Sequence, residues 1–274
     1  MKHRPALLAL LAIAVSLPAL PSWIAVAPVY RAPIHFSPDG LALTPVRIDG
    51  AEVTALIDSG TPRTIQLSAT LARTLRIALA DTAARARDGG GTPRAVKTGH
   101  LHTLSLGNYS EAGPVAEVVE GSVERIAQTA RAPVEVVLGW GFLSRFYTVL
   151  DYPGGRWEFS DAPIPRGRSR AALRSPLIHG APIVGVEIDG RIEAFLVDTG
   201  APVSQLDAGF AHAPPGVVRL RAFVLDGTSL GLRFRISDLS ALKRSLGAVG
   251  VLGNDWLRGY TVSIDPAERV ITFD

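Results

Sequence analysis

Two short motifs in this sequence carry carboxylic acids in matching surroundings. Asp58 opens an Asp-Ser-Gly motif, and Asp198 opens an Asp-Thr-Gly motif. An apolar triplet precedes each aspartate, Ala-Leu-Ile in the first case and Phe-Leu-Val in the second. Such a strand fixes a carboxylate at the end of a buried edge, and the glycine permits the tight turn that follows.

Two such turns that face each other would form an acid–base site. The hydroxyls of Ser59 and Thr199 can then bond to backbone in the opposite loop and lock the two loops together. Like charges at close range cannot both ionise, so the two carboxyls share one proton. One acts as base on a water and the other as acid toward a carbonyl oxygen, which suits amide hydrolysis without a covalent intermediate. Because the pair titrates as a unit, neither aspartate is assigned a fixed role.

Both motifs belong to a duplicated segment. Residues 46–62 and 186–202 align without a gap, which places the two aspartates 140 residues apart. A second landmark, Val-Leu-Gly, occurs at 137–139 and again at 251–253, 114 residues apart. The second copy is therefore 26 residues shorter between its landmarks. Two copies indicate an internal duplication, because a solenoid needs more units to bury its faces.

The segments around these motifs favour short strands and turns. Aspartates in turn-forming contexts are Asp49, Asp189, Asp151 and Asp265. The expected strands cover residues 46–48, 53–57, 147–150, 156–159 and 270–273. Short helices are expected from Ser68, with Leu71 and Leu75 on one face, and over residues 122–130. Residues 161–175 are rich in arginine and proline, and we interpret them as a linker between lobes.

The paired motifs and their Val-Leu-Gly partners resemble the pepsin and retropepsin superfamily of aspartic proteases, most closely its bacterial retropepsin-like branch. The resemblance covers residues 40–160 and 180–274, so both lobes lie in one chain. It implies an all-β, two-lobed fold with pseudo-twofold symmetry and a few short helices. It also implies an aspartic endopeptidase that needs no metal or cofactor, with Asp58 and Asp198 catalytic. The loop residues implied to support them are Ser59, Gly60, Thr61, Thr199, Gly200 and Ala201.

Departures from the family pattern shape the functional expectations. Only the first copy has room for a flap, with Gly89, Gly90 and Gly91 as its expected mobile tip, and no tyrosine lies between residues 85 and 100. Ala201 lacks the hydroxyl that helps to keep an aspartate ionised in this superfamily, so the expected working pH is mildly acidic to neutral. The shortened second lobe leaves an alternative open, a catalytically silent module that binds peptides on the same fold.

The composition and the N-terminal sequence limit the possible compartment and partners of this protein. The chain has no cysteine, which excludes disulfides and thiolate chemistry, and its net charge of +3 without a basic stripe argues against nucleic acid. Positive residues at 2–4 precede an apolar run over 6–20, the layout of a secretory signal. Because the apolar stretch continues to Val29, a retained membrane anchor stays open as an alternative.

The expected product is an exported, periplasmic or secreted monomer that binds an extended peptide. The expected divisions are 1–27 signal or anchor, 28–165 first lobe and 166–274 second lobe.

Several other residues have simpler explanations than chemistry. We expect Asp255, which replaces Gly141 in the second copy, to be a surface or capping residue. His100 and His102 are expected on a solvated face, since no third metal ligand has suitable spacing. The aromatic residues after the Val-Leu-Gly landmarks are expected in the core; they are Trp140, Phe142 and Trp256.

Overall fold

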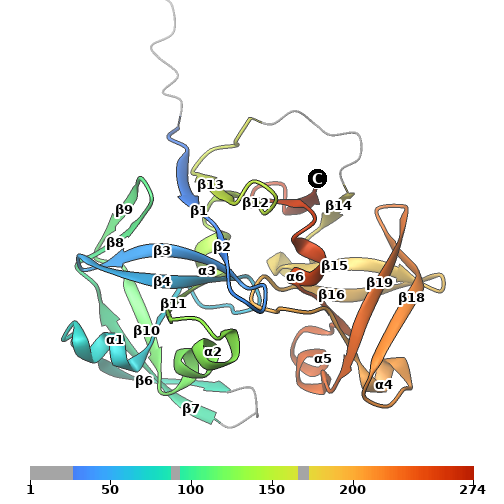
Figure 1. Cartoon of the computed structure of the whole chain (residues 1–274), viewed down its shortest axis with the longest axis horizontal. Helices are drawn as coiled ribbons and strands as arrows, with labels where there is room; N and C mark the ends of the chain where they lie inside the picture. Colours follow the sequence, from blue (N-terminus) through green and yellow to red (C-terminus); the bar gives the residue numbers. More distant parts are fainter. Residues whose placement is uncertain (1–26, 88–92, 166–172) are drawn as a thin grey trace, which may run out of the picture.

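The computed structural model describes residues 27–87, 93–165 and 173–274, and these form two β-rich lobes joined by a six-stranded sheet (Figure 1). The predicted all-β, two-lobed fold is confirmed. The helices are short: α1 (Ala69–Thr74), α2 (Ser122–Ala130), α3 (Trp140–Leu143), η1 (Ile178–Gly180), α4 (Ala208–Ala211), α5 (Ser240–Leu246) and α6 (Asn254–Leu257). None of the helices in the described ranges is long and apolar enough to cross a membrane.

The first lobe is built on a ten-stranded sheet, and the second on a closed barrel. The strands of the first lobe are β2 (His35–Phe36), β3 (Ala42–Ile48), β4 (Ala51–Asp58), β5 (Ile65–Leu67), β6 (Ala80–Arg87), β7 (Pro93–His100), β8 (Thr103–Leu106), β9 (Tyr109–Ala112), β10 (Val115–Val119) and β11 (Val134–Gly139). The barrel contains β15 (Ile183–Ile188), β16 (Arg191–Val197), β17 (Gln205–Asp207), β18 (Val217–Leu225), β19 (Thr228–Ser237) and β20 (Gly250–Leu252).

Local sequence explains why these elements begin where they do. The hairpin turns at Asp49-Gly50 and Asp189-Gly190 have positive φ at both positions, the conformation that Asp-Gly turns favour. The side chain of Ser68 accepts a hydrogen bond from the Leu71 amide and caps α1, as predicted. The helix predicted over residues 122–130 coincides with α2.

The six-stranded sheet combines strands from both halves of the chain. Its order is β1-β13-β12-β21-β22-β14, with β12 and β21 antiparallel at the centre. Val149 lies opposite Ser263, and these two residues are 114 apart, the spacing of the second landmark. The pseudo-twofold axis therefore passes between them. The strands are β1 (Tyr30–Pro33), β12 (Tyr147–Asp151), β13 (Arg156–Ser160), β14 (Leu173–Pro176), β21 (Thr261–Asp265) and β22 (Val270–Phe273).

One boundary of the predicted linker is wrong, because its last three residues lie in β14. This strand is four residues long and its burial alternates, with Leu173 and Ser175 inward and Arg174 and Pro176 outward. A strand with a single large apolar residue gives no apolar run to recognise. Its counterpart β1 has the same Arg-x-Pro spacing, at Arg31 and Pro33.

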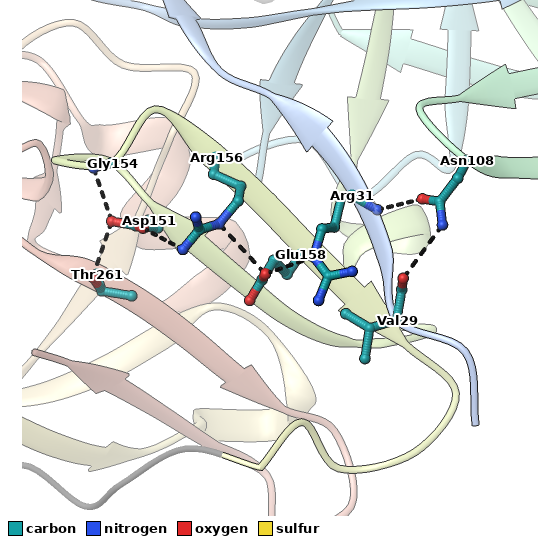
Figure 2. A network of polar contacts seen from close by, with 8 residues as sticks. All are labelled: Val29, Arg31, Asn108, Asp151, Gly154, Arg156, Glu158 and Thr261. Carbon is teal, nitrogen blue, oxygen red and sulfur yellow. Dashed lines mark hydrogen bonds and ion pairs between the residues drawn. The ribbon is translucent and has the colours of Figure 1, made fainter. Parts of the chain in front are cut away.

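A polar network covers the outer face of this sheet and reaches from one lobe to the other (Figure 2). The amide side chain of Asn108 accepts from the Arg31 N–H at 2.6 Å and donates to the Val29 carbonyl at 3.4 Å, which fastens the edge strand β1. From the first lobe to the second, the contacts run through Asn108, Arg31, Glu158, Arg156, Asp151 and Thr261.

The opposite, inner face of the sheet is apolar and packs on the lobes. Trp157 and Phe159 on β13 are fully buried and contact Phe142 of α3. Trp140, Phe142 and Trp256 are all buried, so the prediction that these aromatics belong to the core is confirmed.

Among the described residues, only the first lobe has a β6–β7 hairpin, which lies on the side of the molecule away from the six-stranded sheet (Figure 1). In the second lobe α4 ends at Ala211 and β18 begins at Val217, so no strand occupies the place of β6. This explains the 26 residues missing from the second copy and agrees with a single flap. The predicted tip, Gly89 to Gly91, lies outside the described residues.

Candidate active site

The two aspartates lie at equivalent ends of two buried strands. Asp58 is the last residue of β4, and Asp198 directly follows β16. In each lobe the Val-Leu-Gly strand runs parallel beside the strand that precedes the aspartate, so Leu138 pairs with Ile57 and Leu252 with Val197. The two landmarks of each repeat therefore meet in space, as the family resemblance implied.

Four hydrogen bonds join the two aspartate loops reciprocally. The Ser59 hydroxyl donates to the Val197 carbonyl at 2.6 Å and accepts from the Thr199 N–H at 3.1 Å. The Thr199 hydroxyl donates to the Ile57 carbonyl at 2.7 Å and accepts from the Ser59 N–H at 2.9 Å. All four bonds are buried, and they confirm the prediction that these hydroxyls bond to backbone in the opposite loop.

Glycine lets each carboxyl approach the opposite loop. A Cβ added at Gly60 would lie 2.5 Å from both carboxylate oxygens of Asp198, and one added at Gly200 would lie 2.5 Å from the carboxyl carbon of Asp58. Carbon atoms at such distances would force a shift, so neither loop tolerates a side chain here. The crossed contacts bring the two carboxyls together at the pseudo-twofold axis.

The segments after Val-Leu-Gly hold the loops from behind. In the first lobe the Trp140 N–H donates to the Thr61 carbonyl at 2.8 Å, and in the second the Asn254 N–H donates to the Ala201 carbonyl at 2.8 Å. A Cβ at Gly253 would meet the Ala201 carbonyl oxygen at 2.9 Å, which explains the glycine of the landmark.

The site raises the pKa of both carboxyls. For Asp58, burial raises the pKa well above its usual range and the charge of Asp198 raises it further, against the N–H groups of Thr61 and Gly60. For Asp198, burial raises the pKa while the Gly200 N–H and a hydrogen bond with Asp58 oppose that rise. A pair of this kind retains one proton at a pH where isolated aspartates are ionised.

Backbone amides, not the predicted hydroxyl, support Asp58. Its Oδ1 accepts from the Gly60 N–H at 2.9 Å and the Thr61 N–H at 3.1 Å, and no hydrogen bond from the Thr61 hydroxyl is found in the described part of the chain. In the second lobe the Gly200 N–H donates to Asp198 Oδ1 at 2.8 Å. Ala201 is buried against apolar neighbours.

Three residues near the site escaped the sequence reading. Asn254 is fully buried and its side chain donates to the Thr199 carbonyl at 2.7 Å. The Tyr152 hydroxyl is buried on the inner side of the six-stranded sheet, and Arg63, five residues after Asp58, pairs with Glu117 of β10. The "LGND" segment at 252–255 contained a signal for Asn254, since its counterpart reads "LGWG".

Three residues outside the aspartate loops were expected to have no catalytic role, namely Asp255, His100 and His102. Asp255 is exposed, which confirms the expected surface position, and its carboxylate accepts from the Ser204 N–H and hydroxyl at 2.8 and 2.7 Å. His100 and His102 are both exposed. Across the described ranges, no group of three or more potential metal ligands is close enough to hold an ion.

Comparison with known families agrees with this geometry. Residues 44–142 match the family model described as aspartyl protease. The match begins in β3, includes Asp58 and its loop, and ends in α3 after the first Val-Leu-Gly landmark. No curated protein sequence matches the chain.

Proposed function

This chain belongs to the retropepsin-like aspartic proteases, and we propose that it is an endopeptidase whose single chain supplies both halves of the active site. The observation that carries the proposal is the crossed placement of Asp58 and Asp198. Each carboxyl lies against the glycine of the opposite loop, and four buried hydrogen bonds between the loops fix the pair.

The proposed reaction uses only these carboxyls and a water. One ionised carboxylate removes a proton from the water as the water oxygen attacks the peptide carbonyl carbon. The protonated partner donates its proton to the carbonyl oxygen, giving a neutral tetrahedral diol. Collapse of this diol transfers a proton to the leaving amine and restores the shared proton. No metal or cofactor enters this scheme.

An extended peptide is the proposed substrate. Such a peptide can bind between the lobes with strand-like backbone hydrogen bonds, and the β6–β7 hairpin is the proposed cover. Since one chain provides both loops, the active form is proposed to be a monomer. The N-terminal segment is proposed to direct export, with cleavage and retention as an anchor both left open.

The raised pKa of both aspartates supports activity at mildly acidic to neutral pH. The protonated member of the pair keeps its proton as the pH rises toward neutrality, so the acid remains available there. A profile that peaks below pH 3 would contradict this part of the proposal.

The test is cleavage of a complex peptide library by the purified protein from pH 3 to pH 8, read by mass spectrometry. We expect internal cuts in extended peptides by the wild type and none by the Asp58→Asn variant. Peptide capture without cleavage at any pH would instead favour the catalytically silent binding module, for which the missing β6 counterpart is the structural argument.

A further inference from the structure

Tyr152 is a buried polar residue near the active site that the proposed reaction does not use. It follows β12, and strand alternation places its side chain on the inner face with Thr148 and Leu150, opposite to Asp151. Only 2% of the residue is exposed, and its ring stacks on Phe36 at 5.8 Å between centroids.

The Tyr152 hydroxyl is buried and makes no hydrogen bond of normal geometry in the described part of the chain. Leaving a buried hydroxyl unpaired destabilises the folded protein, so a hydroxyl at such a position calls for an explanation. The groups around the Tyr152 hydroxyl point to an explanation. The Thr199 side chain lies beside it, and burial, together with the charge of Asp198, raises the pKa of Tyr152.

The hydroxyl oxygen of Thr199 can accept one more hydrogen bond. Its hydroxyl donates to Ile57 and accepts from the Ser59 N–H, which leaves one of its two oxygen lone pairs unused. A tyrosine O–H is a donor of the kind that this lone pair accepts, and Tyr152 is a neighbour of Thr199.

The support is confined to the second loop. Asn254 holds the Thr199 carbonyl, whereas its counterpart Trp140 donates its indole N–H to the Gly180 carbonyl instead. At the position equivalent to Tyr152, 114 residues later, the chain has Pro266, which has no hydroxyl. The two aspartate loops thus have similar backbone arrangements, but the side chains packed against them differ.

We propose that Tyr152 is a positioning residue, whose O–H bonds to the Thr199 hydroxyl beneath the catalytic pair and favours the negative charge on Asp198, leaving the shared proton on Asp58. Its kinetic consequence rests on the proposed peptidase activity. The O–H dipole of Tyr152, with its hydrogen directed at the second loop, stabilises a carboxylate there. The hydrogen bond between the two carboxyls acts in the same sense, since it lowers the pKa of Asp198 and raises that of Asp58.

Few charged groups compete for this region. In the described part of the chain, the charged group that acts on Tyr152 is Asp198, and Asp58 is the partner of Asp198 in the pair. Arg258 lies over the Phe36 ring, 4.5 Å from its centroid, and Phe36 in turn stacks on Tyr152. Asp151 points to the outer network with Arg156.

The test compares Tyr152→Phe with Tyr147→Phe, a control at the other end of β12 on the outer side. We expect Tyr152→Phe to move the acidic limb of the kcat/KM profile upward by about one pH unit, because a donor that favoured the ionised pair is lost. Carbon-13 NMR titration of the aspartate carboxyls should show the same upward shift without any substrate. Tyr147→Phe should change neither.

The NMR titration separates this proposal from the peptidase proposal, since it works even if the wild type cleaves nothing. An unchanged carboxyl titration in Tyr152→Phe, with an unchanged or higher Tm, would overturn the proposal and leave Tyr152 as packing alone. The variant keeps the ring that stacks on Phe36, so folding should be retained, and thermal unfolding checks this directly.

Discussion

Replacing Asp58 with asparagine is expected to lower kcat/KM by more than about 1000-fold and, at neutral pH, to raise the free energy of unfolding. The loss of activity follows because an amide cannot hold or give the shared proton. The gain in stability follows from the raised pKa of Asp58, whose main causes are burial and the charge of Asp198.

The sign of the stability change depends on pH. Because folding raises the pKa of Asp58, its carboxyl stabilises the folded protein below the unfolded pKa, and this contribution is lost as pH rises through the folded-state pKa. Asparagine does not ionise, so the variant avoids this loss. Urea unfolding at several pH values should therefore show similar stabilities in acid and a growing advantage for Asp58→Asn toward neutral pH.

Asp189→Asn is the matched control for this experiment. Asp189 lies in the hairpin turn between β15 and β16, at the position equivalent to Asp49 in the first lobe. It is exposed and has a φ of 50°, which asparagine also tolerates. Activity and its pH profile should be unchanged. A stability difference between Asp58→Asn and wild type that did not vary with pH would contradict the assignment of a raised pKa to Asp58.

A methyl group at position 60 is expected to disable the site without replacing either aspartate. In Gly60→Ala the new carbon would lie 2.5 Å from both carboxylate oxygens of Asp198, so that side chain or the Gly60 loop must move. A displacement of about 1 Å in a catalytic group costs about 100-fold in rate, which is the loss we expect.

The same substitution should also destabilise the protein. Overpacking costs about 1 to 3 kcal/mol, which exceeds the roughly 0.4 to 1 kcal/mol that alanine gains over glycine through the unfolded chain. The measurements are kcat/KM on a peptide chosen from the library and urea unfolding. Gly216→Ala is the control, because its nearest neighbour to a new Cβ is 3.9 Å away; wild-type activity in Gly60→Ala would show that the crossed contact is dispensable.

Local patterns predicted the parts of this molecule that are duplicated in sequence. The aspartates, the hydroxyls of Ser59 and Thr199 and the β-rich lobes were all found by comparing two copies that fold alike. The turns at Asp49 and Asp189 followed from the conformational preference of Asp-Gly itself. Each of these inferences needs only a short segment and its repeat.

The features that the sequence reading missed depend on contacts between distant segments. Strand β14 exists because β22 offers it an edge, not because Leu173–Pro176 has strong β character. Tyr152 follows a strand in what reads as an ordinary turn, and only the inward side of the sheet brings it near Thr199. Asn254 stood in a recognised motif, yet its bond to Thr199 spans 55 residues.

The six-stranded sheet has a further consequence for when this protein can act. Its central pair includes β21, and β22 joins that pair to the edge strand β14. These two strands lie within residues 261–273, while the first aspartate loop is already present by residue 60. A chain that lacks these last strands therefore has no complete sheet to align the two aspartate loops. Under the proposed peptidase function, this order of assembly would delay cleavage until the last strands have folded, when the chain itself no longer offers extended segments to cut.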